Sequence, residues 1–177
     1  MRRILAPLIA GVLLLAGCAA GDTTGTETGD TAGSSVQAGT GTELGGAATW
    51  DFSAETLEGG TFDGASVAGT PTVIWFWAPW CPTCRSQIPT VTRLAEEYDG
   101  EVEFIGAGSL ASDAEIRELA ETIPHVTHLI DVDGTVWTKF GVTAQSTFAV
   151  IDENGDVVAD GYLDTGALED AVADVAG

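Results

Sequence analysis

The chain has 177 residues, of which 27 are Asp or Glu and only 6 are Lys or Arg, so its formal net charge is −21. Such an excess of negative charge repels nucleic-acid phosphates and anionic lipid headgroups. The composition therefore argues against a nucleic-acid-binding protein and against electrostatic docking on a membrane. The length allows one domain with a single hydrophobic core.

The N-terminus is typical of a secretory signal. Two arginines precede an apolar stretch at residues 4–15, which is too short to span a bilayer as a mature helix. The stretch ends in LAGC at residues 15–18, which resembles the lipobox of bacterial lipoproteins. The resemblance implies a signal peptide at residues 1–17 and a lipid on the thiol of Cys18. An ordinary signal peptide with an incidental cysteine is the alternative.

Residues 18–48 differ in composition from the rest of the chain. They are mostly Gly, Thr, Ala, Ser and acidic residues, and they contain no aromatic residue. Such a segment cannot bury enough apolar surface to offset its ordering entropy, so we expect a flexible tether. About 30 residues of Gly-rich coil span roughly 30 Å, enough to hold a domain at residues 49–177 clear of the headgroups. We therefore expect an extracytoplasmic, lipid-anchored protein.

Hydrophobic periodicity and turn residues predict the elements of this domain. In chain order they are a hairpin of strands 50–56 and 61–63, a strand at 72–77, a helix at 81–98, a strand at 101–106, a helix at 112–121, a strand at 126–130, a short helix at 135–140, a hairpin of strands 147–152 and 156–162, and a helix at 165–175. The apolar run at 72–77 is typical of a central strand buried on both faces. Strands that alternate with helices predict an α/β sheet covered by helices.

Two cysteines lie where this central strand ends and a helix begins. Free N–H groups and the helix dipole stabilise an anion there, which favours a reactive thiolate. The spacing of Cys81 and Cys84 places them on one face, close enough to form a small disulfide ring. Pro82 is tolerated in the first turn, where its missing N–H has no helical partner. We expect Cys81 to be the exposed nucleophile and Cys84 the deeper, resolving cysteine.

Two other interpretations of the cysteine pair stay open. A structural zinc site usually takes four ligands, and the further soft ligands are His125 and His128, which we expect to be surface or connector residues. A purely structural disulfide would close a very short loop and stabilise the fold poorly. Exchange between disulfide and thiols is the preferred interpretation, because the predicted extracytoplasmic compartment allows disulfides to form.

The segment FWAPWCPTCR at residues 76–85 resembles the active site of the thioredoxin superfamily, and Pro89 matches its helix-kinking proline. The N-terminal hairpin and the helix at 112–121 resemble the extracytoplasmic TlpA/ResA/DsbE-like branch. The resemblance implies a thioredoxin-like fold, with a central mixed sheet flanked by helices, an N-terminal hairpin and an extra helix. It also implies exchange through a mixed disulfide, with the Cys81–Cys84 disulfide as the redox centre and no further cofactor.

The resemblance assigns roles to residues around the pair. Trp80, Pro82 and Thr83 would shape the reduction potential, and Gln145 and Ser146 would form the wall that faces the cysteines.

Two positions depart from the family pattern. Trp75 stands where many cytoplasmic relatives carry a buried acid, and Ser146 stands where the family carries a cis-proline. The residues leave open whether the peptide bond before Ser146 is cis or trans. We expect longer-lived mixed disulfides, or some capture of metal by the two cysteines.

The sequence thus predicts an extracytoplasmic thiol–disulfide oxidoreductase on a lipid anchor. Its partners would be protein thiols or disulfides of the cell envelope and an electron donor or acceptor, without nucleic acid. Reduction or interchange is the favoured direction. The alternative is a thioredoxin-fold lipoprotein that binds copper or zinc through the same cysteines.

Overall fold

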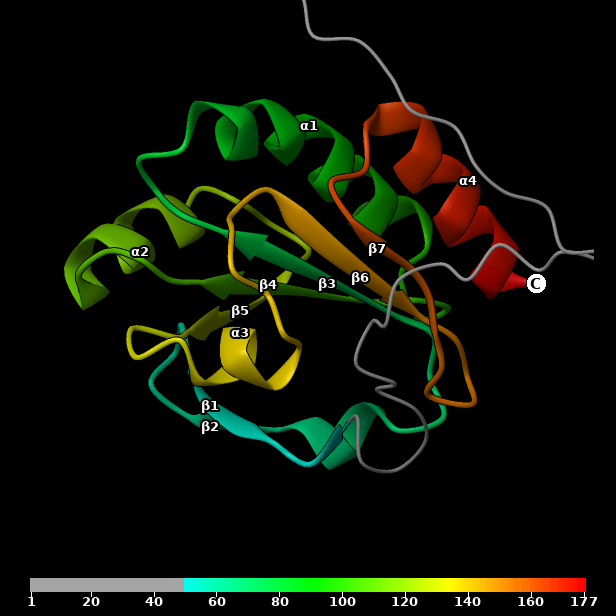
Figure 1. Cartoon of the computed structure of the whole chain (residues 1–177), viewed down its shortest axis with the longest axis horizontal. Helices are drawn as coiled ribbons and strands as arrows, with labels where there is room; N and C mark the ends of the chain where they lie inside the picture. The colour runs from blue at the N-terminus through cyan, green and yellow to red at the C-terminus, as the bar shows by residue number, and fades with distance from the viewer. Residues whose placement is uncertain (1–49) are drawn as a thin grey trace, which may run out of the picture. The chain divides into compact units, whose positions relative to one another are not determined.

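The computed structural model describes residues 50–177, so the predicted signal peptide, Cys18 and the tether at 18–48 lie outside the described residues. The elements in chain order are β1 (Ser53–Thr56), β2 (Thr61–Asp63), η2 (Gly64–Val67), β3 (Thr72–Trp77), α1 (Pro82–Glu97), β4 (Glu103–Gly108), α2 (Asp113–Ala120), β5 (Thr127–Ile130), α3 (Thr135–Lys139), β6 (Thr147–Ile151), β7 (Val157–Gly161) and α4 (Thr165–Ala176). Figure 1 shows this arrangement.

The strands form one seven-stranded sheet in the order β2-β1-β5-β4-β3-β6-β7. Strands β3, β4 and β5 are parallel, whereas β6 runs antiparallel to β3 and β1 runs antiparallel to β5. The prediction of a mixed sheet flanked by helices, with an N-terminal hairpin and an extra helix, is confirmed. The fold is thioredoxin-like.

Strand β3 is buried on both faces, as its continuous apolar sequence predicts. Val73, Trp75 and Trp77 belong to the core beneath α1, α2 and α4. Ile74 and Phe76 point the other way and pack in a second core with α3 and the N-terminal hairpin. Figure 1 shows α1 and α4 side by side over one face of the sheet and α3 on the other. The strand that leads to the cysteines is therefore held from both sides.

The topology brings two distant segments to one edge of the sheet. Helix α1 begins just after the C-terminal end of β3, and β6 starts opposite that end because it is antiparallel, with Phe76 facing Thr147. The loop before β6, which carries Gln145 and Ser146, therefore meets the first turn of α1.

Local signals predicted most boundaries to within two or three residues. The capping box at Ser112 and Glu115 is present at the start of α2. Strand β4 begins at Glu103, two residues later than predicted, because Glu101 and Val102 hydrogen-bond to Tyr98 in the turn after α1. The η2 turn was not predicted. No helix within residues 50–177 has the length and apolar character needed to cross a membrane.

Candidate functional site

Cys81 occupies the N-cap of α1, one residue before the helix begins. Its Sγ accepts a hydrogen bond from the N–H of Cys84 at 3.1 Å, as a capping side chain does. Pro82 is the first helical residue, where no N–H is needed. A sulfur in this position faces the free N–H groups and the positive end of the helix dipole, so it is stabilised as an anion.

Both thiols are free, and their surroundings shift their pKa values in opposite directions. Burial opposes ionisation of Cys81, but hydrogen bonds from the Cys84 thiol, the Ser146 hydroxyl and the N–H groups of Cys84 and Thr83 hold its pKa below the usual 9.0. Burial raises the pKa of Cys84 above 9.0, and the hydrogen bond and negative charge of Cys81 add to this effect. One sulfur is therefore prepared to attack while its neighbour stays protonated.

The expectation of an exposed Cys81 is wrong. Cys81 is 3% exposed and Cys84 is fully buried. The loop before β6 covers them, because the N–H of Ser146 bonds to the carbonyl of Phe76 at 2.9 Å and holds the loop against the end of β3. The hydroxyl of Ser146 then lies 3.1 Å from the sulfur of Cys81 and 3.2 Å from that of Cys84. Gln145, its neighbour in the same loop, is half-buried.

The other residues of the motif lie around the first turn of α1. Trp80 is 54% exposed, and its indole N–H donates to the carbonyl of Leu110 at 2.8 Å. Thr83 is exposed in the first turn of the helix. Arg85 donates through Nε to the carbonyl of Pro79 at 2.8 Å and closes the turn before the helix. These contacts fix the chain on both sides of Cys81.

One residue of this site, Gln87, was missed by sequence reasoning. Trp75 donates through its indole N–H to Oε1 of Gln87 at 2.9 Å, and Nε2 of Gln87 donates to the carbonyl of Ser146 at 3.4 Å. The tryptophan in place of a buried acid is therefore linked through Gln87 to the loop that faces the cysteines. Gln87 follows Cys84 by three residues on one face of α1, which was the available sequence signal.

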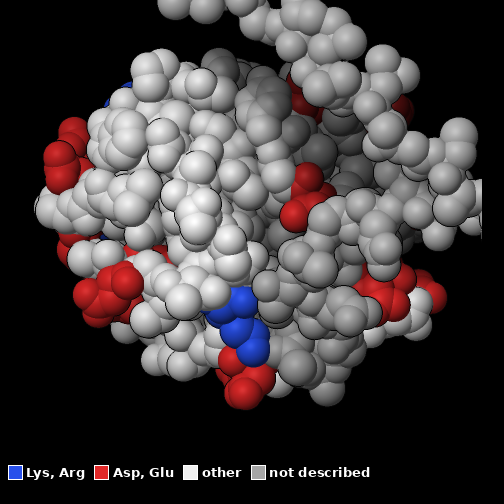
Figure 2. Space-filling view, in the orientation of Figure 1, with Lys and Arg blue, Asp and Glu red and all other residues white. Residues whose placement is uncertain are grey.

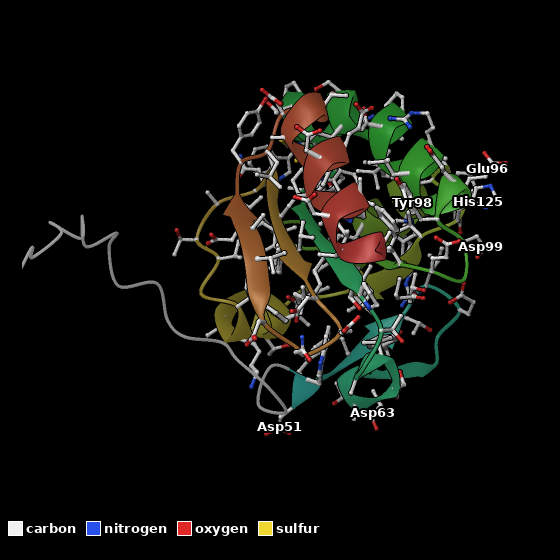
Figure 3. The ribbon with its side chains drawn as sticks, turned by 90° about the vertical axis from the view of Figure 1, so that its right-hand side faces the viewer. Asp51, Asp63, Glu96, Tyr98, Asp99 and His125 are labelled. Atoms are coloured by element: carbon white, nitrogen blue, oxygen red, sulfur yellow. The ribbon has the colours of Figure 1, made fainter. Side chains whose placement is uncertain are left out.

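The two histidines do not join the cysteines. His125 precedes β5, which runs parallel to β4 as β3 does, so it lies towards the N-terminal ends of these strands, whereas the cysteines follow the C-terminal end of β3. Figure 3 shows His125 near Tyr98 and Asp99, at the C-terminal end of α1. His128 lies on β5, and the prediction of a surface or connector position for it is wrong: it is 4% exposed and packs against Trp77.

The metal-binding alternative receives no support from this donor set. Within residues 50–177, no three His, Cys, Asp or Glu side chains are grouped so that they could hold an ion. A pair of sulfurs alone falls short of the four ligands of a structural zinc site.

Comparisons with known proteins agree with this geometry. Residues 31–175 match the Redoxin family. The soluble secreted antigen MPT53 of Mycobacterium tuberculosis is 35% identical over 105 residues, which cover 59% of this chain and 60% of that protein. The thiol:disulfide interchange protein DsbE of Pseudomonas aeruginosa is 34% identical over 92 residues, which cover 51% of this chain and 50% of that protein. The chain thus spans only part of the length of either relative.

Two solved structures are similar over most of this chain. The structure of MTB dsbF has a TM-score of 0.68 and 39% identity, and the match covers 73% of this chain and 98% of that one. A secreted M. tuberculosis disulfide oxidoreductase homologous to E. coli DsbE has a TM-score of 0.65 and 30% identity, with coverages of 71% and 96%. The chain therefore belongs to the Redoxin family, and its thioredoxin-like domain is similar to solved structures that include a disulfide oxidoreductase.

Proposed function

We propose that this protein exchanges a Cys81–Cys84 disulfide with thiols or disulfides of other proteins outside the cytoplasm. The observation that carries the proposal is the asymmetry of the pair. The N-cap sulfur of Cys81 has a lowered pKa, whereas the sulfur of Cys84, one turn into α1, has a raised pKa. Exchange needs an ionised nucleophile beside a thiol that is activated only later.

In the reducing direction the reaction has two steps. The thiolate of Cys81 attacks one sulfur of a partner disulfide, and the other partner sulfur leaves with the electron pair of the broken bond and takes up a proton. Cys84 then releases its proton to solvent and attacks the sulfur of Cys81, which frees the second partner sulfur as a thiol. The partner gains two electrons and the Cys81–Cys84 pair loses them, so a separate electron donor must reduce the pair again.

The direction and the partners belong to the same proposal. We infer reduction or interchange of protein disulfides in the cell envelope, with an electron donor or acceptor of that compartment. Two relatives are described as secreted, MPT53 and the DsbE homologue of M. tuberculosis, which supports a place outside the cytoplasm. The lipobox-like sequence that ends at Cys18 supports a membrane anchor there. Trp80, Pro82, Thr83 and Gln145 would shape the potential and the surface that meets the partner.

Trapping of the mixed disulfide tests the roles of the two cysteines. We expect the reduced Cys84→Ser variant to accumulate a covalent complex with native, disulfide-bonded insulin, because the Cys81 nucleophile can attack an insulin disulfide and the resolving thiol is missing. Cys81→Ser should form none. In the reduced wild type at neutral pH, Cys81 should react with iodoacetamide about tenfold faster than Cys84, since the pKa of Cys81 is lowered and that of Cys84 is raised. Mass spectrometry of the peptides measures both results.

The reverse pattern, with complexes on Cys81→Ser alone, would exchange the two roles. Reduction of insulin by dithiothreitol that is no faster with the wild type than without it would contradict the function itself. The equilibrium of the wild-type pair with glutathione decides the direction: a pair that stays reduced even in strongly oxidising mixtures has a high reduction potential and would contradict the inferred reducing role.

A further inference from the structure

The hydroxyl of Ser146 lies between the two reactive sulfurs. Its oxygen is 3.1 Å from Sγ of Cys81 and 3.2 Å from Sγ of Cys84, and the side chain is 7% exposed. A hydroxyl has one proton to donate, so it can serve one sulfur at a time. A thiolate can only accept, and it is the stronger acceptor of the two sulfurs. The hydroxyl therefore donates to whichever sulfur is charged.

The backbone of Ser146 is held so that this hydroxyl points at the sulfurs. Its φ is 67°, in the left-handed region that a non-glycine residue rarely adopts. The N–H donates to the carbonyl of Phe76 at 2.9 Å, and the carbonyl accepts from Gln87 at 3.4 Å. Both backbone groups are thus tied to elements that border the site, β3 and α1. Strained backbone of this kind persists where surrounding contacts impose it, and it gathers at functional sites.

We propose that Ser146 is a catalytic residue of the exchange reaction, whose hydroxyl donates a hydrogen bond to the thiolate of Cys81 in the reduced protein and to Cys84 in the mixed disulfide. This proposal rests on the proposed function, because it assigns a role within the same two steps. When Cys81 is bonded to a partner sulfur, it carries no charge and no longer competes for the hydroxyl proton. The hydrogen bond is then free to move to Cys84 as that thiol ionises.

The electron count of the exchange is unchanged by this role. The sulfur of Cys84 supplies the electron pair of the new bond to Cys81, and the partner sulfur leaves with the pair of the old bond. The proton of Cys84 goes to solvent, and the leaving sulfur takes one from solvent. Ser146 keeps its own proton throughout and only changes the sulfur to which it donates.

This role has a direct effect on the redox equilibrium. The hydrogen bond stabilises the thiolate of the reduced form and has no charged acceptor in the disulfide. Removing it should therefore favour the disulfide relative to the dithiol. It should also raise the pKa of Cys81, since the Ser146 hydroxyl is one of the groups that lower it.

Replacement of Ser146 by glycine tests this role, because glycine adopts the left-handed backbone and keeps the N–H while it removes the CH2OH side chain. In Ser146→Gly of the full-length protein we expect thiolate absorbance to titrate about one pH unit higher. The equilibrium with glutathione should move about tenfold towards the disulfide. The mixed disulfide with glutathione should last about tenfold longer, since Cys84 loses its donor. Ser146→Ala should show the same three changes.

Ser86→Ala is the matched control, because the Ser86 hydroxyl donates to the carbonyl of Thr83 at 2.7 Å in the same helix and touches neither sulfur. The thiolate titration of Ser86→Ala and its equilibrium with glutathione should match those of the wild type. If Ser146→Gly folds and keeps the wild-type thiolate titration and glutathione equilibrium, the proposal is wrong although the function stands. If the wild type itself forms no disulfide with glutathione, the function fails and this role fails with it.

Proline at position 146 is not an equivalent test. Its ring fixes φ near −65° and it has no N–H, so it can neither adopt the observed φ of 67° nor bond to Phe76. Any change in such a variant would mix the loss of the hydroxyl with movement of the whole loop.

Discussion

Cys81 and Cys84 are the same side chain only three residues apart, yet their surroundings move the two pKa values in opposite directions. Cys81 lies outside the helix and accepts its first N–H groups, whereas Cys84 lies within the first turn among core side chains. The Ser146 hydroxyl lies within hydrogen-bond distance of both sulfurs, at 3.1 Å from Cys81 and 3.2 Å from Cys84, so the backbone N–H groups and burial make the difference. At this scale reactivity follows from which backbone and hydroxyl donors reach each sulfur.

His128 is a further residue whose pKa is shifted by burial. Its Nε2 lies 3.1 Å from the carbonyl of Ile123 and donates to it, and its ring packs edge-on against Trp77. Within the described residues its Nδ1 has no hydrogen-bond partner. Burial lowers the pKa of His128 below 6.5, against weaker opposing effects of Ile123 and of the Glu58 charge. The histidine is therefore neutral in the folded protein at neutral pH.

This burial predicts a pH dependence of stability. Below about pH 6.5 the unfolded chain takes up a proton on this histidine and the folded chain does not, so acid favours unfolding until the folded pKa is reached. His128→Gln keeps a donor for Ile123 and cannot titrate. Urea unfolding of both reduced proteins from pH 7.5 to 5 should show the wild type losing stability relative to the variant. A difference that stays constant with pH would contradict the prediction.

At the scale of the elements, β3 and β4 bring the active site and the extra helix together. The indole of Trp77 lies over β4, where Gly106 and Gly108 leave room for it. A Cβ at Gly108 would lie 2.5 Å from Cγ2 of Ile116 in α2 and 2.9 Å from Cζ2 of Trp77. The packing of β4, the Trp77 indole and α2 therefore leaves no space for a methyl group at Gly108. This contact lies directly before the cysteine motif.

Gly108→Ala should consequently destabilise the protein by about 1–3 kcal/mol, because β4, α2 or the indole must shift. Gly166→Ala is the matched control: its Cβ would meet only Oδ1 of Asp164 at 3.7 Å, and alanine favours the helix. The control should be as stable as the wild type or more so. Denaturant unfolding measures the stability of both variants. A Gly108→Ala variant as stable as the wild type would contradict the prediction and show that β4, α2 and the indole can shift at no cost.

At the scale of the molecule, the net charge and the proposed lipid anchor have separate effects on membrane attachment. The chain carries a net charge of −21, and Figure 2 shows acidic side chains in several patches around the visible face. Such a surface is repelled by anionic lipid, which disfavours electrostatic attachment to a membrane and agrees with the proposed attachment through a lipid on Cys18. The same charge favours partners that are neutral or basic near their cysteines.

Cys18→Ala tests the anchor. In cell fractionation the wild type should stay in the membrane pellet after a wash in 1 M salt, because a lipid anchor is not screened by ions. Cys18→Ala should move to the soluble fraction, and Cys81→Ala, which keeps the anchor, should not. A wild type released by salt alone would contradict the lipid and indicate an electrostatic association.

The sequence alone was sufficient for the strands, the helices and the placement of the cysteine pair. These features rest on local signals: the apolar run of β3, the capping box of α2, the Asn154-Gly155 turn between β6 and β7, and two cysteines at a strand–helix boundary. Each depends on residues a few positions apart, whose propensities and periodicity are readable without a fold. The shift of β4 arose from hydrogen bonds in the preceding turn.

Only the tertiary structure decided how the pair is covered and which groups reach it. The Ser146 hydroxyl lies 65 residues from Cys81 in the chain, and the Trp75–Gln87–Ser146 contacts join three segments. The burial of Cys81 and His128 likewise depends on a loop and an indole from elsewhere in the chain. The sequence pattern shows which residues are apolar or reactive. Whether Ser146 contacts the two cysteines depends on the antiparallel pairing of β6 with β3, because contacts between distant segments follow from strand order and not from distance along the sequence.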